Sequence, residues 1–213
     1  GAHKGEGLGN KFLANIRETD AIIEVVRAFD GGDIIHVNNQ VNPSNDIGVI
    51  NAELILADLD TVVTRLENTK KKGANDKEAK AQLPTLERFA TELQKGTLIS
   101  TLEMLEEEEL LARELNLLTA KPFLYVINVS DTQLAESWAP DAELLATLAG
   151  APYVVMCNKL ELELSELAPE ERSQFLAELQ LPESGLDQLV RMAYKTLGLL
   201  SFLTTGPEES RAW

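Results

Sequence analysis

The sequence predicts an α/β fold in which a parallel sheet is interrupted by an antiparallel pair of helices. Short β-branched, apolar runs end in polar residues at 21–29, 122–129 and 153–157. Apolar residues between the first two runs recur at helical spacings of three and four. Helical patterns then alternate with the later runs. Alternating strands and helices form a parallel sheet with helices on its faces.

The first block is predicted as a loop, a helix and a strand. Residues 1–9 are rich in glycine, and a short helix follows through Phe12, Leu13 and Ile16. The run Ala21–Phe29 has the β-branched, apolar character of a buried parallel strand, and Asp30-Gly31-Gly32-Asp33 ends it.

The middle block predicts two helices joined by a polar turn, with Lys70, Lys71 and Lys72 at the tip. Pro84 lies inside the second pattern, where we expect a kink or a helix start. A further helix is expected from the acidic residues 106–109 to about Leu118, since acid suits a first helical turn. The apolar positions of the pair are Val49, Ala52, Leu56, Leu59, Val63 and Leu66, then Ala79, Leu83, Leu86, Ala90 and Leu93.

The third block returns to alternating strands and helices. The strand at 122–129 is followed by a helix at 141–148, and the strand at 153–157 by helices starting at Pro169 and Gly185. Residues 201–205 then look like a new strand that the chain end at Trp213 leaves without a partner.

The composition limits which partners and which cellular setting are expected. The net charge is −16, which argues against broad binding to nucleic acids or membrane surfaces, because Lys and Arg supply that attraction. The single cysteine cannot form an internal disulfide, so a reducing, cytoplasmic setting is expected. No apolar run approaches the roughly 20 residues that span a bilayer, so no membrane is expected as a partner.

Two strand ends carry candidate ligand-binding residues. Asn128-Val129-Ser130-Asp131 and Asn158-Lys159-Leu160-Glu161 both resemble the Asn-x-x-Asp pattern with which nucleotide-binding domains recognise a base. A carboxylate in the fourth position can accept hydrogen bonds from the ring N–H and the exocyclic amine of guanine. Asn and Asp are also common in ordinary turns after strands, so either tetrapeptide alone is also consistent with a turn.

Other motifs are absent or weak. No Gly-Lys-Ser/Thr triplet, and hence no P-loop, occurs in the 213 residues, and Gly5-Glu6-Gly7-Leu8-Gly9 lacks the preceding strand of a dinucleotide site. His3, His36 and one cysteine make no zinc set, so no protein metal ligands are expected. Cys157 is better explained as a small buried apolar residue than as a nucleophile. The three lysines fit a solvated turn, with contact to RNA as the alternative.

Longer segments resemble the Obg-like ATPase (YchF) family, and the resemblance covers essentially the whole chain. Gly1–Leu13 resembles the family's switch II segment, and Ile16–Ile22 and Val25–Phe29 follow its pattern. Similar stretches are Asp46–Leu59, Lys121–Val129, Glu161–Leu167, Ser184–Leu186 and Thr205–Trp213.

The resemblance implies a partial P-loop NTPase: a G domain interrupted by a coiled-coil hairpin and followed by a TGS domain. The implied segments are a first G-domain part at 1–48, the hairpin at 49–120, a second G-domain part at 121–199 and the start of a truncated TGS domain at 200–213. The P-loop, switch I and the ligands of Mg²⁺ would lie upstream of Gly1, so the chain is expected to be an inactive fragment.

Family members are ribosome-associated and hydrolyse ATP or GTP. By resemblance, His3 falls where some relatives carry a histidine proposed to position water. The base-reading motif falls on Asn128, Val129 and Asp131, and the second base loop on Cys157, Asn158 and Lys159. The GTPase-like Asn158–Glu161 tetrapeptide is then a decoy. Asp131 replaces the family's glutamate, which puts a preference for ATP in question, and Asn158 replaces a small residue.

A second interpretation belongs to another functional class. The helical pair on an α/β scaffold is also consistent with a protein-interaction module that retains no nucleotide function. The two interpretations differ in what they expect upstream of Gly1. A strand followed by a P-loop favours the enzyme, and its absence from the complete gene favours the module.

Overall fold

The computed structural model describes residues 8–30, 41–72, 76–207 and 209–212. These residues fall into two compact units. The first, called the helical unit, comprises residues up to 22 together with 42–122 and 141–149. The second, called the sheet unit, comprises 23–41, 123–140 and 150 onward.

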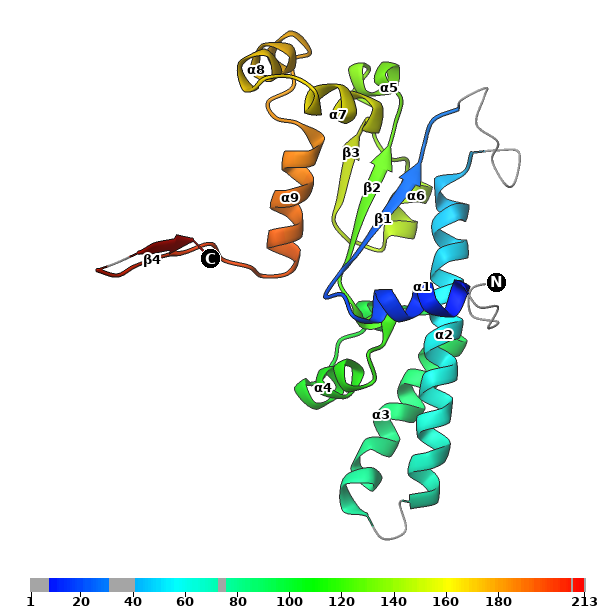
Figure 1. Cartoon of the computed structure of the whole chain (residues 1–213). Helices are drawn as coiled ribbons and strands as arrows, with labels where there is room; N and C mark the ends of the chain where they lie inside the picture. Colours follow the sequence, from blue (N-terminus) through cyan, green and yellow to red (C-terminus); the bar gives the residue numbers. More distant parts are fainter. Residues whose placement is uncertain (1–7, 31–40, 73–75, 208, 213) are drawn as a thin grey trace. The chain divides into compact units, whose positions relative to one another are not determined.

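The helical unit is built around two packed helices, α2 (Pro43–Lys72) and α3 (Lys77–Gln94), which run antiparallel (Figure 1). Both helices were predicted from the spacing of apolar residues. Val62, Leu86, Phe89 and Leu93 are almost fully buried between them. The remaining elements of the unit are α1 (Leu8–Arg17), η2 (Ile99–Thr101), α4 (Glu106–Glu114), η3 (Leu118–Ala120) and α6 (Ala142–Leu148).

Two sequence expectations in this unit, for Pro84 and for the end of the helix at 106–118, compare with the structure as follows. Of the two alternatives for Pro84, the helix start is wrong, because α3 begins at Lys77 and includes Pro84; the kink stays a prediction. Leu86, Phe89 and Leu93 bury the following turns, and this packing outweighs the lost hydrogen bond. Helix α4 ends at Glu114 instead of near Leu118, since Asn116 takes a left-handed conformation with φ of 50°.

A buried carboxylate fastens α2 to η3. Asp58 has no exposed surface and accepts hydrogen bonds from the N–H groups of Leu118 (2.9 Å) and Thr119 (2.7 Å) and from the Thr119 hydroxyl (2.7 Å). Arg17 of α1 lies 3.6 Å away. Burial raises the pKa of Asp58 above its ordinary value, and the hydrogen bonds and Arg17 oppose that rise.

The sheet unit contains a three-stranded parallel sheet with strand order β1-β2-β3, formed by β1 (Ile22–Arg27), β2 (Phe123–Asn128) and β3 (Tyr153–Met156). The register pairs Tyr125 with Tyr153 and Asn128 with Met156. Strand β2 is buried along almost its whole length, as expected for a central parallel strand. All three strands were predicted from their β-branched and apolar runs.

The helices of the sheet unit are α5 (Asp131–Ala135), α7 (Asn158–Ser165), α8 (Pro169–Glu178) and α9 (Gly185–Thr196). Leu189 and Met192 of α9 pack on Val126, Val154 and Met156 of the sheet. Leu160 and Leu164 of α7 form a second cluster with Cys157. Helices α5 and α7 were not predicted, because both are short and begin directly at the polar strand ends.

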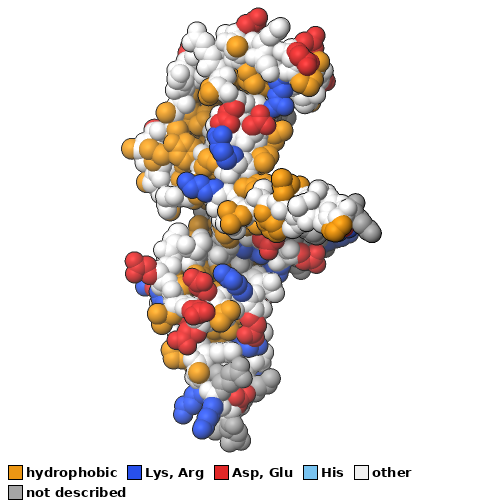
Figure 2. All heavy atoms as spheres, turned by 90° about the vertical axis from the view of Figure 1, so that its left-hand side faces the viewer, with side chains coloured by type: hydrophobic (Ala, Val, Ile, Leu, Met, Phe, Trp, Pro, Cys, Tyr) orange, Lys and Arg blue, Asp and Glu red, His pale blue; other side chains and the backbone are white. Residues whose placement is uncertain are grey.

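The last strand expected from the sequence does find a partner. Strand β4 (Leu203–Thr205) pairs antiparallel with β5 (Ser210–Ala212), so the expectation that it would remain unpaired is wrong. Figure 2 shows apolar side chains gathered along the face that carries α9 and these strands. The exposed apolar residues there are Leu186, Val190, Tyr194, Leu197, Leu199, Leu200, Phe202 and Leu203.

Candidate functional site

The first candidate tip lies where β2 ends and α5 begins. Asn128 is the last residue of β2, and Ser130 is the N-cap of α5. The Ser130 hydroxyl accepts the N–H of Gln133, and the Gln133 side chain accepts the N–H of Ser130, at 3.1 and 2.9 Å. This capping box fixes the backbone that carries Asp131 at the first position of the helix.

The second tip lies where β3 ends and α7 begins. Cys157 is 2% exposed and is the N-cap of α7, so it has the buried position expected of a small apolar side chain. Asn158 and Lys159 form the first turn of the helix, and both side chains are exposed. Each tip therefore holds its polar residues on a rigid helix start.

The two tips meet at one edge of the sheet. The N–H of Val129 donates to the carbonyl of Met156, and the N–H of Asn158 donates to Oδ1 of Asn128, both at 3.0 Å. Because a backbone N–H can only donate, it requires the oxygen of the Asn128 amide and thereby fixes the orientation of that side chain. The Nδ2 group of Asn128 is then the part left to donate outward.

An ion pair joins the two helix starts. Lys159 Nζ lies 3.2 Å from Oδ2 of Asp131, and the Thr132 N–H donates to the other oxygen, Oδ1, at 2.8 Å. The Thr132 N–H and then Lys159 hold the pKa of Asp131 below its ordinary value. Asp131 in turn raises the pKa of Lys159. Both side chains are charged at neutral pH and face solvent, 62% and 71% exposed.

The Glu161 carboxylate makes its contacts within the fold. Its carboxylate accepts the N–H groups of Gly185 (2.7 Å) and Leu186 (3.2 Å) at the start of α9. A Cβ at Gly185 would lie 2.5 Å from Cβ of Met156 and 3.0 Å from Oε1 of Glu161, so only glycine fits. Glu161 is therefore engaged at the start of another helix, and the interpretation of Asn158–Glu161 as a decoy stays a prediction.

Sequence reasoning missed two features of these tips. The Ser-x-x-Gln pattern at 130–133 is a recognisable capping box and could have predicted α5. The Glu161–Gly185 contact had no such signal, because its partners are 24 residues apart in the chain.

His3 and His36 lie outside the described residues. Within the described ranges, no group of three or more His, Cys, Asp and Glu side chains could hold a metal ion. No helix in those ranges is long and apolar enough to cross a membrane.

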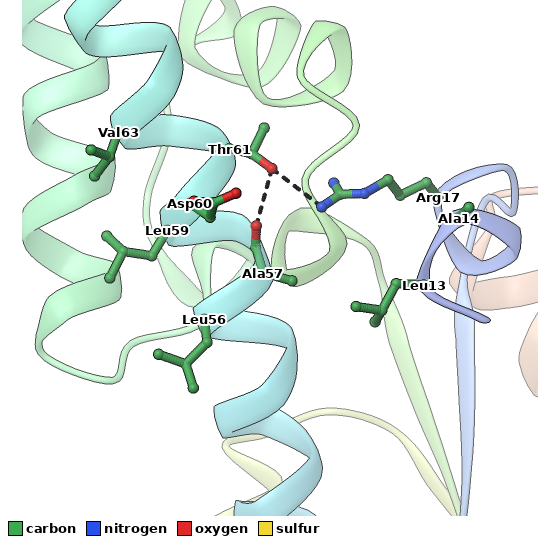
Figure 3. Close-up of a pocket in the computed structure, with 9 residues that line it drawn as sticks. All are labelled: Leu13, Ala14, Arg17, Leu56, Ala57, Leu59, Asp60, Thr61 and Val63. Carbon is green, nitrogen blue, oxygen red and sulfur yellow. Dashed lines mark hydrogen bonds between the residues drawn. The ribbon is translucent and has the colours of Figure 1, made fainter. Parts of the chain in front are cut away.

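A separate hollow of about 640 Å³ lies between α1 and α2 in the helical unit (Figure 3). Its walls are mainly apolar, with Leu13, Leu56 and Leu59 among them. Among the described residues that line it, the basic one is Arg17, which already donates to Thr61 Oγ1 (3.2 Å) and to the carbonyl of Asn116 (2.9 Å). Arg17 and Thr61 are thus engaged with each other in a groove between packed helices, whereas the strand tips present Asp131 and Lys159 to solvent.

Comparison with known proteins finds relatives of this chain in both structure and sequence. A solved structure of the YchF GTPase of Schizosaccharomyces pombe matches all of the chain with a TM-score of 0.85 and 32% sequence identity. The "Ribosome-binding ATPase YchF" of Escherichia coli O157:H7 is 43% identical over 215 residues, and that of Bacillus subtilis (strain 168) 44% over 218. Both alignments cover the whole chain. No family model matches the sequence.

The fold, with polar helix starts at the ends of parallel strands, is that of a G domain. Over its entire length, the chain belongs to the YchF family. It spans about 59% of the length of the Escherichia coli and Schizosaccharomyces pombe proteins.

Proposed function

We propose that the protein binds and hydrolyses purine nucleoside triphosphates and that this chain carries the half that recognises the base. The observation that carries the proposal is the junction of the two strand tips, where the Asn158 N–H fixes the Asn128 amide. Around this junction lie Asp131 and Lys159. Nucleotide ligands of open α/β sheets bind at the carboxyl ends of the strands, where these residues stand.

Each residue has a distinct part in this proposal. Asn128 donates from Nδ2 to N7, an acceptor that adenine and guanine share, which allows both ATP and GTP to bind. Val129 acts through its main chain, because its N–H ties the two tips together. Cys157, Asn158 and Lys159 form the opposite wall. Asp131 adds a carboxylate that only guanine, with its paired donors, can engage fully.

Chemistry at the phosphates belongs to the other half of the protein. Phosphoryl transfer relies on backbone amides, a lysine and Mg²⁺ around the β- and γ-phosphates. We place the groups that hold Mg²⁺ and phosphate upstream of Gly1, and we assign to His3 the positioning of the attacking water. The 213-residue chain alone is then inactive, and His3→Ala in the full-length protein slows turnover more than it weakens binding.

The proposal extends to partners and domains. The relatives named ribosome-binding ATPases support a cytoplasmic protein that acts at the ribosome. The inserted domain at 49–120 divides the G domain into 1–48 and 121–199, and 200–213 begins a TGS domain. Lys70 and Lys71 are exposed near the end of α2, where RNA is their proposed partner, although Lys70 also pairs with Glu87 at 2.9 Å. Lys72 is the third residue of this proposed contact.

Calorimetric titration of the full-length protein with ATP, GTP and CTP tests the proposal. We expect both purine nucleotides to bind more tightly than CTP, and Asn128→Ala to weaken both about tenfold, as for one lost hydrogen bond and a loosened junction. Asn68→Ala, an exposed position on α2, is the matched control. If the folded protein binds neither ATP nor GTP, the interpretation as a protein-interaction module is favoured. Phosphate release by the 213-residue chain that EDTA abolishes would contradict the division into halves.

A further inference from the structure

The Asp131 carboxylate already has two partners in the structure. The Thr132 N–H donates to Oδ1 at 2.8 Å, and the Lys159 ammonium donates to Oδ2 at 3.2 Å. Guanine presents two adjacent donors, its ring N–H and its exocyclic amine, and a carboxylate meets them best with both oxygens. Adenine has no such pair of donors. Of the two oxygens that meet guanine, Oδ2 is the one that Lys159 holds.

The contacts of Asp131 differ in whether they hold its position or only occupy one of its oxygens. The Thr132 N–H comes from the residue next to Asp131, and the capping box of Ser130 and Gln133 fixes the same turn. These contacts orient the Asp131 backbone and one oxygen without any help from Lys159. Lys159 comes from another helix, α7, and its side chain is 71% exposed. Removing its charge frees Oδ2 and leaves the position of Asp131 intact.

We propose that Lys159 sets the balance between adenine and guanine nucleotides by competing for the Asp131 carboxylate. The proposal rests on the base site proposed above. GTP must displace the ammonium from Oδ2, whereas ATP binds with the ion pair closed. Lys159 thus acts as a specificity-determining residue: it lowers the affinity for GTP relative to ATP, and so weakens the preference for GTP that the Asn-x-x-Asp tetrapeptide suggests.

The size of the effect follows from the exposure of the pair. An exposed ion pair is weak, so its loss corresponds to a change of about 1.4- to 5-fold in an equilibrium constant. The affinity ratio of GTP to ATP is the sensitive quantity, because both ligands carry the same triphosphate. Any general attraction between Lys159 and phosphate cancels in that ratio.

The test is competition calorimetry of ATP and GTP on the full-length protein and its Lys159→Met variant. We expect Lys159→Met to raise the GTP-to-ATP affinity ratio by up to about fivefold. Lys195→Met, an exposed lysine of α9, is the control and should leave the ratio unchanged. Because salt screens exposed pairs, moving from low salt to about 1 M should raise the ratio of the unmodified protein in the same direction.

A double-mutant cycle assigns the effect to the pair. In an Asp131→Ala background, Lys159→Met should no longer change the ratio, because the competitor has lost its target. An unchanged or lowered ratio in the single variant, with purine nucleotides still bound, overturns this inference and leaves the proposed function standing. Failure of the folded, unmodified protein to bind either nucleotide overturns both.

Discussion

Asp58 in the helical unit and Asp131 in the sheet unit both accept backbone N–H groups, but they differ in burial. Asp58 is fully buried and satisfied by three donors from Leu118 and Thr119. Asp131 is 62% exposed, and its donors are the N–H and the hydroxyl of Thr132 and the exposed ammonium of Lys159. The same residue type therefore fastens the fold where water is excluded, and stays open to solvent at the sheet edge where we propose the base site.

The buried aspartate gives the largest expected effect. Asp58→Ala leaves the two N–H groups and the hydroxyl without their acceptor, and should lower the free energy of unfolding by about 3 kcal/mol. Chemical denaturation followed by circular dichroism measures this. Asp60→Ala, an exposed aspartate on the same helix, should change stability by less than about 0.5 kcal/mol. Equal effects of the two substitutions would contradict the claim that the buried hydrogen bonds of Asp58 stabilise the fold.

The contact between Glu161 and the start of α9 can be tested by a substitution at Gly185. Gly185→Ala places a methyl group against Met156 and Glu161 and should cost about 2 kcal/mol, as overpacking does. Gly48→Ala is the matched control with the opposite sign. No atom lies within 4 Å of a Cβ there, and helix propensity should stabilise by about 0.5–1 kcal/mol. Thermal unfolding measures both variants. An unchanged stability of Gly185→Ala would show that the space between Gly185, Met156 and Glu161 can admit a methyl group.

Glu108 is an intermediate case. Its Oε2 accepts Arg88 Nη1 at 2.6 Å and the Leu105 N–H at 3.0 Å, and Arg88 and then Leu105 hold the pKa of Glu108 below its ordinary value. A lowered pKa means that the stabilisation is present above the pKa of the unfolded state. It is lost as the pH falls through the folded pKa.

Glu108→Gln should therefore destabilise by about 1 kcal/mol at neutral pH, and the difference should vanish in strong acid. Urea denaturation across pH measures it, with Glu107→Gln, an exposed neighbour in the same turn, as the control. A difference that stays constant down to strong acid would show that the charge of Glu108 does not matter.

The sequence predicted the strands and the helical pair because their signals are local. β-branched runs mark β1, β2 and β3, and apolar spacing marks α2 and α3. The hydrogen bonds of the buried or engaged carboxylates are long-range. Asp58 meets partners about 60 residues away, and Glu161 meets Gly185 across 24, so no spacing rule reveals them. Tertiary packing also keeps Pro84 inside α3, which rules out the helix start that was one of the two alternatives expected there.

The candidate base site was predicted by resemblance, and its residues Asn128, Val129, Asp131, Cys157, Asn158 and Lys159 lie at two adjoining tips. The resemblance supplied their identity. It gave neither the orientation of the Asn128 amide nor the Lys159–Asp131 pair, because both depend on which atoms face each other in space. His3 lies outside the described residues, and its role remains a prediction.

Asp131→Ala in the full-length protein tests most directly whether the exposed aspartate recognises a base. Calorimetric titration should show GTP affinity falling about five- to tenfold more than ATP affinity, since only guanine offers paired donors to the carboxylate. The free energy of unfolding should stay within about 0.5 kcal/mol, as for an exposed side chain. Equal losses for GTP and ATP would contradict the assignment of Asp131 to base recognition.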